Sequence, residues 1–72
     1  GLADFIAECT EADVAGSITS KELYKVYRSW SEKEGVKPAS HKALGQELQE
    51  KGFMSIRTNQ ARIWSGISLR PY

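Results

Sequence analysis

The chain contains few of the residues that build metal centres, disulfide bonds and membrane spans. It has one cysteine, Cys9, and one histidine, His41, among 72 residues. A lone cysteine cannot form an internal disulfide bond, which suits a reducing compartment, and we expect the cytoplasm. One histidine and one cysteine are too few for a His/Cys zinc site. No apolar run approaches the roughly 20 residues of a membrane helix, and no signal peptide is visible at the start. The sequence therefore predicts a domain with no cofactor, no metal ion and no membrane partner.

Motifs for catalysis are also missing. The stretch GQELQEKG, residues 45–52, lacks the Gly-Lys-Ser/Thr of a phosphate-binding loop. Serine, histidine and acidic residues occur, but no motif supports a catalytic triad. His41 has no acidic neighbour in the sequence to orient it, so we interpret it as a packing residue at a helix end. We expect that this domain is not an enzyme.

The net charge is small, but the charged residues are unevenly distributed along the chain. The net charge is +1, yet residues 1–16 hold four acidic residues and no basic one, while residues 17–72 hold ten Lys and Arg against five acids. This asymmetry predicts one face for an anionic partner and another that avoids it; the alternative is ordinary solvated surface.

A length of 72 residues allows one small domain. Because both ends look cut, we expect residues 1–72 to be a single domain excised from a larger replication protein.

Two helices are predicted in the first half. Apolar residues at i, i+3, i+4 and i+7 predict the first over about residues 2–11. Ile18 is expected in a short extended piece. Thr19, followed three residues later by Glu22, is typical of a helix start, and Gly35 of a helix end. These signals predict a second helix over residues 20–34.

A third helix is predicted after a short linker. Pro38 disfavours helix in the residue before it, and Ser40 is a suitable cap for a helix over about residues 41–51. Gly52 would end this helix. Gly45 is expected on the inner face, where it would let another backbone approach closely.

From Phe53 onward the apolar period changes to two, which predicts strands. FMSIR, residues 53–57, is the expected partner of residues 63–69, with TNQA at a turn wider than two residues. Ile63, Ile67 and Leu69 are predicted to face inward. Trp64, on the opposite face with Arg62, either covers the outside of the core or stacks on a partner.

This order of elements predicts an α+β fold of the winged helix-turn-helix type: three helices with a C-terminal two-stranded wing. In such proteins the second helix of the motif enters the major groove. Lys42, Gln46 and Gln49 would then meet base edges, since lysine can address guanine and glutamine adenine. Ser40 at the helix start suits a phosphate. The expected partner is double-stranded DNA.

The hairpin turn carries the other predicted contacts. Arg57 and Arg62 flank the tip, and Asn59 and Gln60 lie at it. Together with Lys37 in the linker, they would hold phosphate or the minor groove. The alternative is that the two arginines keep a sheet edge soluble. A rival function is protein interaction, in which the acidic first helix with Tyr24 and Trp64 docks a neighbouring helicase domain or a second copy of the chain.

Several short motifs resemble a known family. They are L-Y-x-x-Y-x-x-W from Leu23 to Trp30, the glycine at 35, L-x-x-K-G-F from Leu48 to Phe53, and Gly66-Ile67 with Leu69. Together they resemble the C-terminal domain of phage- and plasmid-encoded primase-helicases of the satellite-phage and poxvirus type, which carry a superfamily-three helicase motor. The resemblance implies a winged-helix module that binds origin DNA and positions the motor, with primase and helicase chemistry in other domains. It also admits dimerisation, or a wing that contacts protein.

Overall fold

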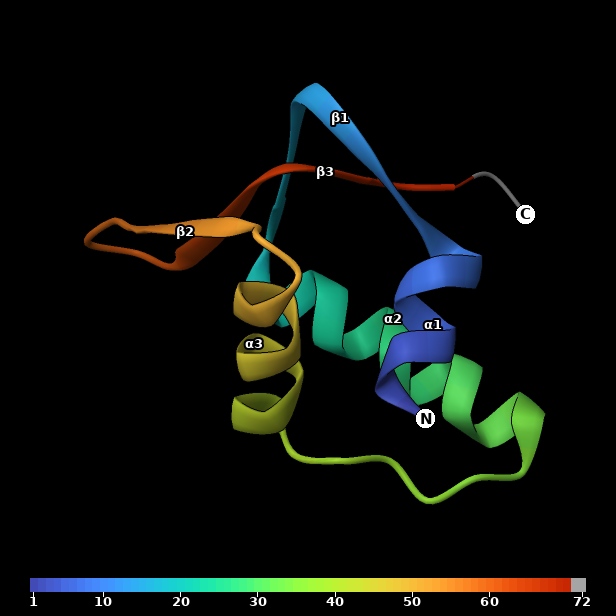
Figure 1. The fold of residues 1–72 in the computed structure, drawn as a ribbon. Coiled ribbons are helices and arrows are strands. Elements are labelled where there is room, and N and C mark those ends of the chain that lie inside the picture. Colours follow the sequence, from blue (N-terminus) through green and yellow to red (C-terminus); the bar gives the residue numbers. More distant parts are fainter. Residues whose placement is uncertain (71–72) are drawn as a thin grey trace.

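The computed structural model describes residues 1–70 and has an α+β architecture, in which three helices lie on one side of a three-stranded antiparallel sheet (Figure 1). The element order is α1 (Leu2–Cys9), β1 (Thr10–Thr19), α2 (Ser20–Glu34), α3 (His41–Glu50), β2 (Met54–Arg57) and β3 (Arg62–Leu69). The strand order is β1-β3-β2, so β3 is central and β2 is an edge strand.

The helix ends follow the predicted signals. The Thr19 side chain accepts a hydrogen bond from Glu22 N (3.2 Å), and the Ser40 side chain accepts one from Ala43 N (3.1 Å). Gly35 has φ +70° and Gly52 has φ +94°, the left-handed conformation that glycine adopts without a steric penalty. The predicted span of the second helix is confirmed, and that of the third differs by one residue.

The first helix is shorter than predicted. It ends at Cys9, because Thr10 is extended (φ −130°, ψ 162°) and pairs with Leu69 across the sheet. The expected short piece around Ile18 is the end of a ten-residue strand, β1. A local pattern cannot show this strand, since its partner lies about fifty residues later in the chain. The predicted two-stranded hairpin is present as β2 and β3, but the prediction missed the third strand: β1 pairs with β3, so the sheet has three strands.

Strand β1 contains a protrusion opposite Gly66. Its pairing with β3 shifts between Ala12 and Ser17, and Val14 at the apex is fully exposed (Figure 1). Gly16 closes the protrusion against β3, where a Cβ atom would lie 2.6 Å from the carbonyl oxygen of Ile67. This close approach requires glycine.

Gly66 also changes which residues of β3 face the helices. Its φ of +78° interrupts the alternation of the strand, so Trp64 and Ile67, three residues apart, are both buried. Packing of Trp64 in the core is thereby confirmed. Ile63, which was expected to face inward, is only half-buried, so that part of the prediction is wrong.

The core joins all three helices to β3. Its aromatic part is Phe5, whose ring lies edge-on to Tyr27 (5.1 Å between centroids) and beside Trp30 (5.6 Å). The buried apolar residues are Phe5, Ile6, Cys9, Leu23, Tyr27, Trp30, Leu44, Leu48, Trp64 and Ile67.

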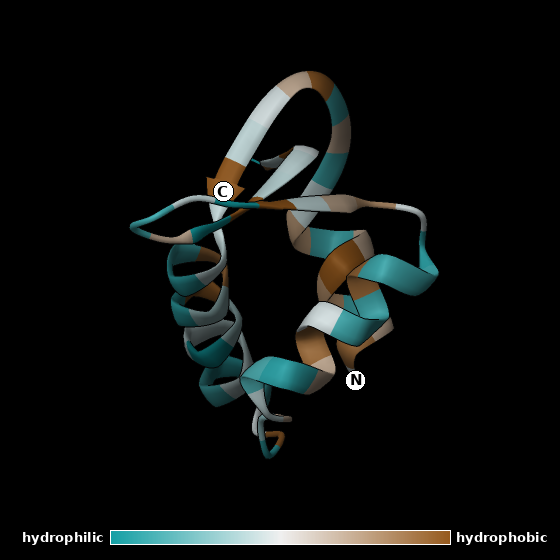
Figure 2. Cartoon of the chain, turned by 90° about the vertical axis from the view of Figure 1, so that its left-hand side faces the viewer, coloured by the Kyte–Doolittle hydropathy of each residue, from teal (hydrophilic) through white to brown (hydrophobic). Residues whose placement is uncertain are grey.

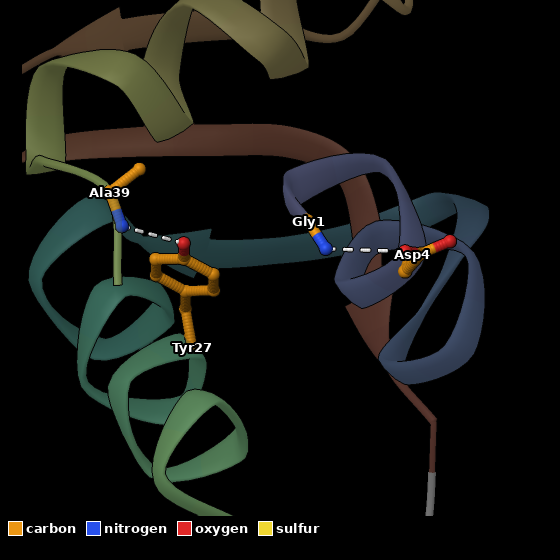
Figure 3. Close-up of polar contacts among 4 residues, drawn as sticks. All are labelled: Gly1, Asp4, Tyr27 and Ala39. Atoms are coloured by element: carbon orange, nitrogen blue, oxygen red, sulfur yellow. Dashed lines mark hydrogen bonds and ion pairs between the residues drawn. The ribbon is translucent and has the colours of Figure 1, made fainter. Parts of the chain in front are cut away.

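Two tyrosines of α2 fix the linker that precedes α3. The Tyr27 hydroxyl accepts a hydrogen bond from Ala39 N (2.8 Å, Figure 3), and the Tyr24 hydroxyl donates one to Ala39 O (2.9 Å). A buried or half-buried peptide group that is paired in this way resists displacement. The start of α3 is therefore fixed relative to α2.

Candidate nucleic-acid interface

A groove of about 560 Å³ lies between α3 and the β2–β3 hairpin. Helix α3 supplies its exposed face, and the hairpin tip supplies the opposite wall. In Figure 2 the hairpin passes above α3, and its tip and much of the helix are hydrophilic. The lining residues are Ser20, His41, Lys42, Leu44, Gly45, Gln46, Gln49, Arg57, Thr58, Asn59, Gln60, Ala61, Arg62 and Trp64.

Two separate segments bring the predicted residues to this groove. Lys42, Gln46 and Gln49 are exposed and lie at i, i+4 and i+7 on α3. This spacing puts them on one side of the helix. Opposite them are four predicted residues from the hairpin: Arg57, Asn59, Gln60 and Arg62.

The sheet register aims both arginines at the groove. Arg57 pairs with Arg62, and Ser55 pairs with Trp64. Paired residues of an antiparallel sheet share a face, and so do residues two apart on a strand. Both arginines therefore share the face of the buried Trp64, which is the face toward the helices, while Met54 and Ile56 are exposed on the other face.

The hairpin turn has four residues, which confirms the expectation of a wider loop. Thr58 stabilises it: Thr58 N donates to Ala61 O (2.8 Å), and Thr58 Oγ1 accepts from Ala61 N (3.0 Å) and Gln60 N (3.2 Å). No residue of this turn has a positive φ, so Asn59 does not use the left-handed conformation. Its side chain and that of Gln60 are presented from a hydrogen-bonded tip.

Two predicted residues lie outside the lining of the groove. Lys37 is exposed in the linker, and the side-chain oxygen of Ser40 caps α3 by accepting a hydrogen bond from Ala43 N. Ser40 lies at the start of α3 and Lys37 in the linker before it, so neither lies between the helix and the hairpin.

The sequence analysis did not predict some of the residues that line the groove. Ser20, His41 and Thr58 also line the groove, and no sequence spacing links Ser20 on α2 to His41 on α3. His41 is exposed, but its ring stacks on Tyr24 at the start of α3 with 4.8 Å between centroids, which confirms its interpretation as a packing residue at a helix end. Gly45 lies in the groove, where an added Cβ would be 3.6 Å from the Trp64 ring, so the expected close backbone approach is wrong.

The charges of the groove are all positive. Lys42, Arg57 and Arg62 line it, and no carboxylate occurs among its lining residues within 1–70. The carboxylate of Glu47 lies outside the lining and is 3.9 Å from Lys51 Nζ. Neither arginine forms an ion pair in the described part of the chain. Like charges directly across a strand pair are unfavourable, and an anion between them would relieve this repulsion.

Comparison with known proteins gives one family. The profile of the family described as Poxvirus D5 protein-like matches residues 1–63. No curated protein matches the chain. None of the helices within residues 1–70 has the length and apolarity needed to cross a bilayer. The match covers most of the sequence, and the chain therefore belongs to the Poxvirus D5 protein-like family, which is related to replication-associated primase-helicases.

Proposed function

We propose that this chain is a winged helix-turn-helix domain that binds double-stranded DNA, without catalysing a reaction, within a larger primase-helicase of phage, plasmid or viral type. Helix α3 enters the major groove, and the β2–β3 hairpin is the wing that holds the sugar-phosphate backbone or the minor groove. Helix–strand–helix–helix–hairpin order and family membership both support this assignment.

One observation carries the proposal: a carboxylate-free groove with cations on both walls. Lys42 comes from the helix, and Arg57 and Arg62 come from the hairpin. Arginine and lysine are the side chains that most often contact phosphate and guanine. The amides of Gln46 and Gln49 on the helix wall suit adenine.

The two walls of the groove have different tasks in this proposal. Lys42 on α3 meets base edges, so Lys42→Ala changes sequence preference by about 1–3 kcal/mol at the base pair it reads. Arg62 on the wing meets phosphate, so Arg62→Ala weakens binding on all sequences. Selection from random duplexes, repeated with each variant, measures both effects. Unchanged binding to the selected duplex after either substitution removes that residue from the interface.

A second candidate is a protein-interaction or dimerisation role in the same replication machinery. The exposed apolar residues on the outer face of the hairpin, Met54 and Ile56, favour it. Trp64 does not, because it is 2% exposed, and the half-buried Tyr24 is engaged with Ala39. Sedimentation of the domain beside a duplex titration separates the two functions: a monomer that binds duplex supports the first, and a dimer indifferent to DNA supports the second.

A further inference from the structure

Ser20 and His41, which open α2 and α3, meet at one end of the groove. His41 Nε2 lies 2.6 Å from Ser20 Oγ, a hydrogen-bond distance, and both residues line the groove. The imidazole ring also stacks on Tyr24, with 4.8 Å between ring centroids and 12° between planes. Two contacts thus orient an exposed side chain that would otherwise sample several rotamers.

The platform beneath the imidazole is itself anchored. The Tyr24 hydroxyl donates to Ala39 O (2.9 Å), and its ring lies beside Tyr27 (5.9 Å between centroids). The position of His41 is therefore set by α2 and by the linker, as well as by α3. An oriented polar group on a supported element is what a binding site requires.

The charged residues that line the groove together with His41 are all positive. Lys42 comes from its own helix, Arg57 and Arg62 come from the hairpin, and α2 contributes the neutral Ser20 and Tyr24. A phosphate bound among these cations would place negative charge beside the imidazole.

We propose that the Ser20–His41 pair is a phosphate-contacting element of this groove, and that duplex binding takes up one proton at His41. The inference rests on the DNA-binding function proposed above. It adds two residues from two helices to the interface, and it makes affinity depend on pH.

The proposed contacts follow from the hydrogen-bond donors of the neutral and of the protonated imidazole. In a neutral imidazole one ring nitrogen accepts, and when this is Nε2, Ser20 donates its hydroxyl hydrogen to it. Both ring nitrogens of an imidazolium donate. After proton uptake from solvent, Nε2–H donates to Ser20 Oγ, and the serine hydrogen becomes available to a phosphate oxygen. Nδ1–H is a second new donor. No covalent bond between heavy atoms changes.

The test measures duplex affinity at fixed salt between about pH 5.5 and 7.5, the range in which histidine titrates. His41 is the single histidine of the sequence, so a pH dependence of binding that is lost on its substitution is assigned to it. With a random-sequence duplex as probe, we expect wild-type affinity to rise about tenfold as the pH falls across this range. Calorimetry in two buffers of different ionisation enthalpy should show uptake of about half a proton per domain at the midpoint, which is the slope that a tenfold change over two pH units requires.

The matched variant is His41→Gln, which keeps a polar side chain near Ser20 but does not titrate. Its affinity should be flat with pH and about tenfold below wild type at the acidic end. If the wild type binds duplex with a clear salt dependence but takes up no proton, this inference is overturned while the DNA-binding function stands. If the wild type binds no duplex at any pH, the DNA-binding function fails, and this inference fails with it.

Discussion

The two sides of this small domain differ in the sign of the charge that their side chains carry. On one side, α1 and the protruding part of β1 carry Asp4, Glu8, Glu11 and Asp13, all exposed. On the other, α3 and the hairpin enclose a groove lined by three cations and no carboxylate of residues 1–70. A net charge of +1 hides this division. The lesson is that the distribution of charge, rather than its sum, bears on whether a domain suits a polyanion.

Two of the four acidic side chains, Asp4 and Asp13, have local partners. The N-terminal ammonium of Gly1 lies 3.2 Å from Asp4 (Figure 3), and Asp13 accepts a hydrogen bond from Ala15 N at 3.0 Å. The arginines of the groove have no such partners within residues 1–70. Part of the acidic side is therefore satisfied within the chain, whereas both arginines of the groove are left for a ligand.

The largest effect on this contrast is expected from removing both arginines. Each phosphate contact adds about 0.9 to the salt slope, so Arg57→Ala with Arg62→Ala should weaken duplex binding on the order of 50-fold at about 0.1 M salt. Fluorescence anisotropy with a labelled duplex measures this loss.

The matched control neutralises the acidic side. Asp4→Asn with Glu8→Gln changes the net charge by the same amount in the opposite direction, and should leave the salt slope unchanged. If the acidic pair altered the slope as much as the arginine pair, binding would depend on total charge and the groove would have no special role.

Thermal unfolding of the double arginine variant should show slightly higher stability than the wild type, since the like-charged pair across the strands is removed.

A smaller effect is expected from two glycines, one on each side. Gly16→Ala places a Cβ 2.6 Å from the Ile67 carbonyl oxygen, so the protrusion must shift. We expect a loss of about 1–3 kcal/mol in the free energy of unfolding, measured by urea titration. An unchanged stability would mean that β1 does not approach β3 this closely.

Gly45→Ala should act in the opposite direction. Its Cβ would meet the Trp64 ring at 3.6 Å, an ordinary van der Waals contact, and alanine favours helix by about 1 kcal/mol. Urea titration should therefore show a stabilised domain. Duplex affinity should fall, because the new methyl group narrows the groove; an affinity equal to wild type would show that nothing approaches α3 at this position.

Local signals were sufficient for much of the fold. Caps at Thr19 and Ser40, and glycines at 35 and 52, predicted the bounds of α2 and α3 to within a residue. The pairing of Thr10 with Leu69 and the interruption at Gly66 depend on contacts between distant segments, so local periodicity missed them. For this reason the first helix was predicted too long and Ile63 was assigned to the wrong face.

The residues of the candidate site also fall into two groups: those that local sequence signals predict, and those that depend on contacts between distant segments. Lys42, Gln46 and Gln49 follow from helical spacing, and the hairpin residues follow from their place at a turn. Ser20 and His41 meet only because Tyr24 and Tyr27 hold the linker against α2, a contact that no sequence spacing encodes. The DNA-binding roles of all these residues remain predictions.

The most direct measurement is the salt dependence of duplex binding between about 50 and 200 mM salt, for the wild type and for the double arginine variant. About four phosphate contacts give a log–log slope of about −3.6 for the wild type, and loss of two contacts gives about −1.8 for the variant. A slope near zero for the wild type, or the same slope for both proteins, would contradict the proposal that this groove is built for the DNA backbone.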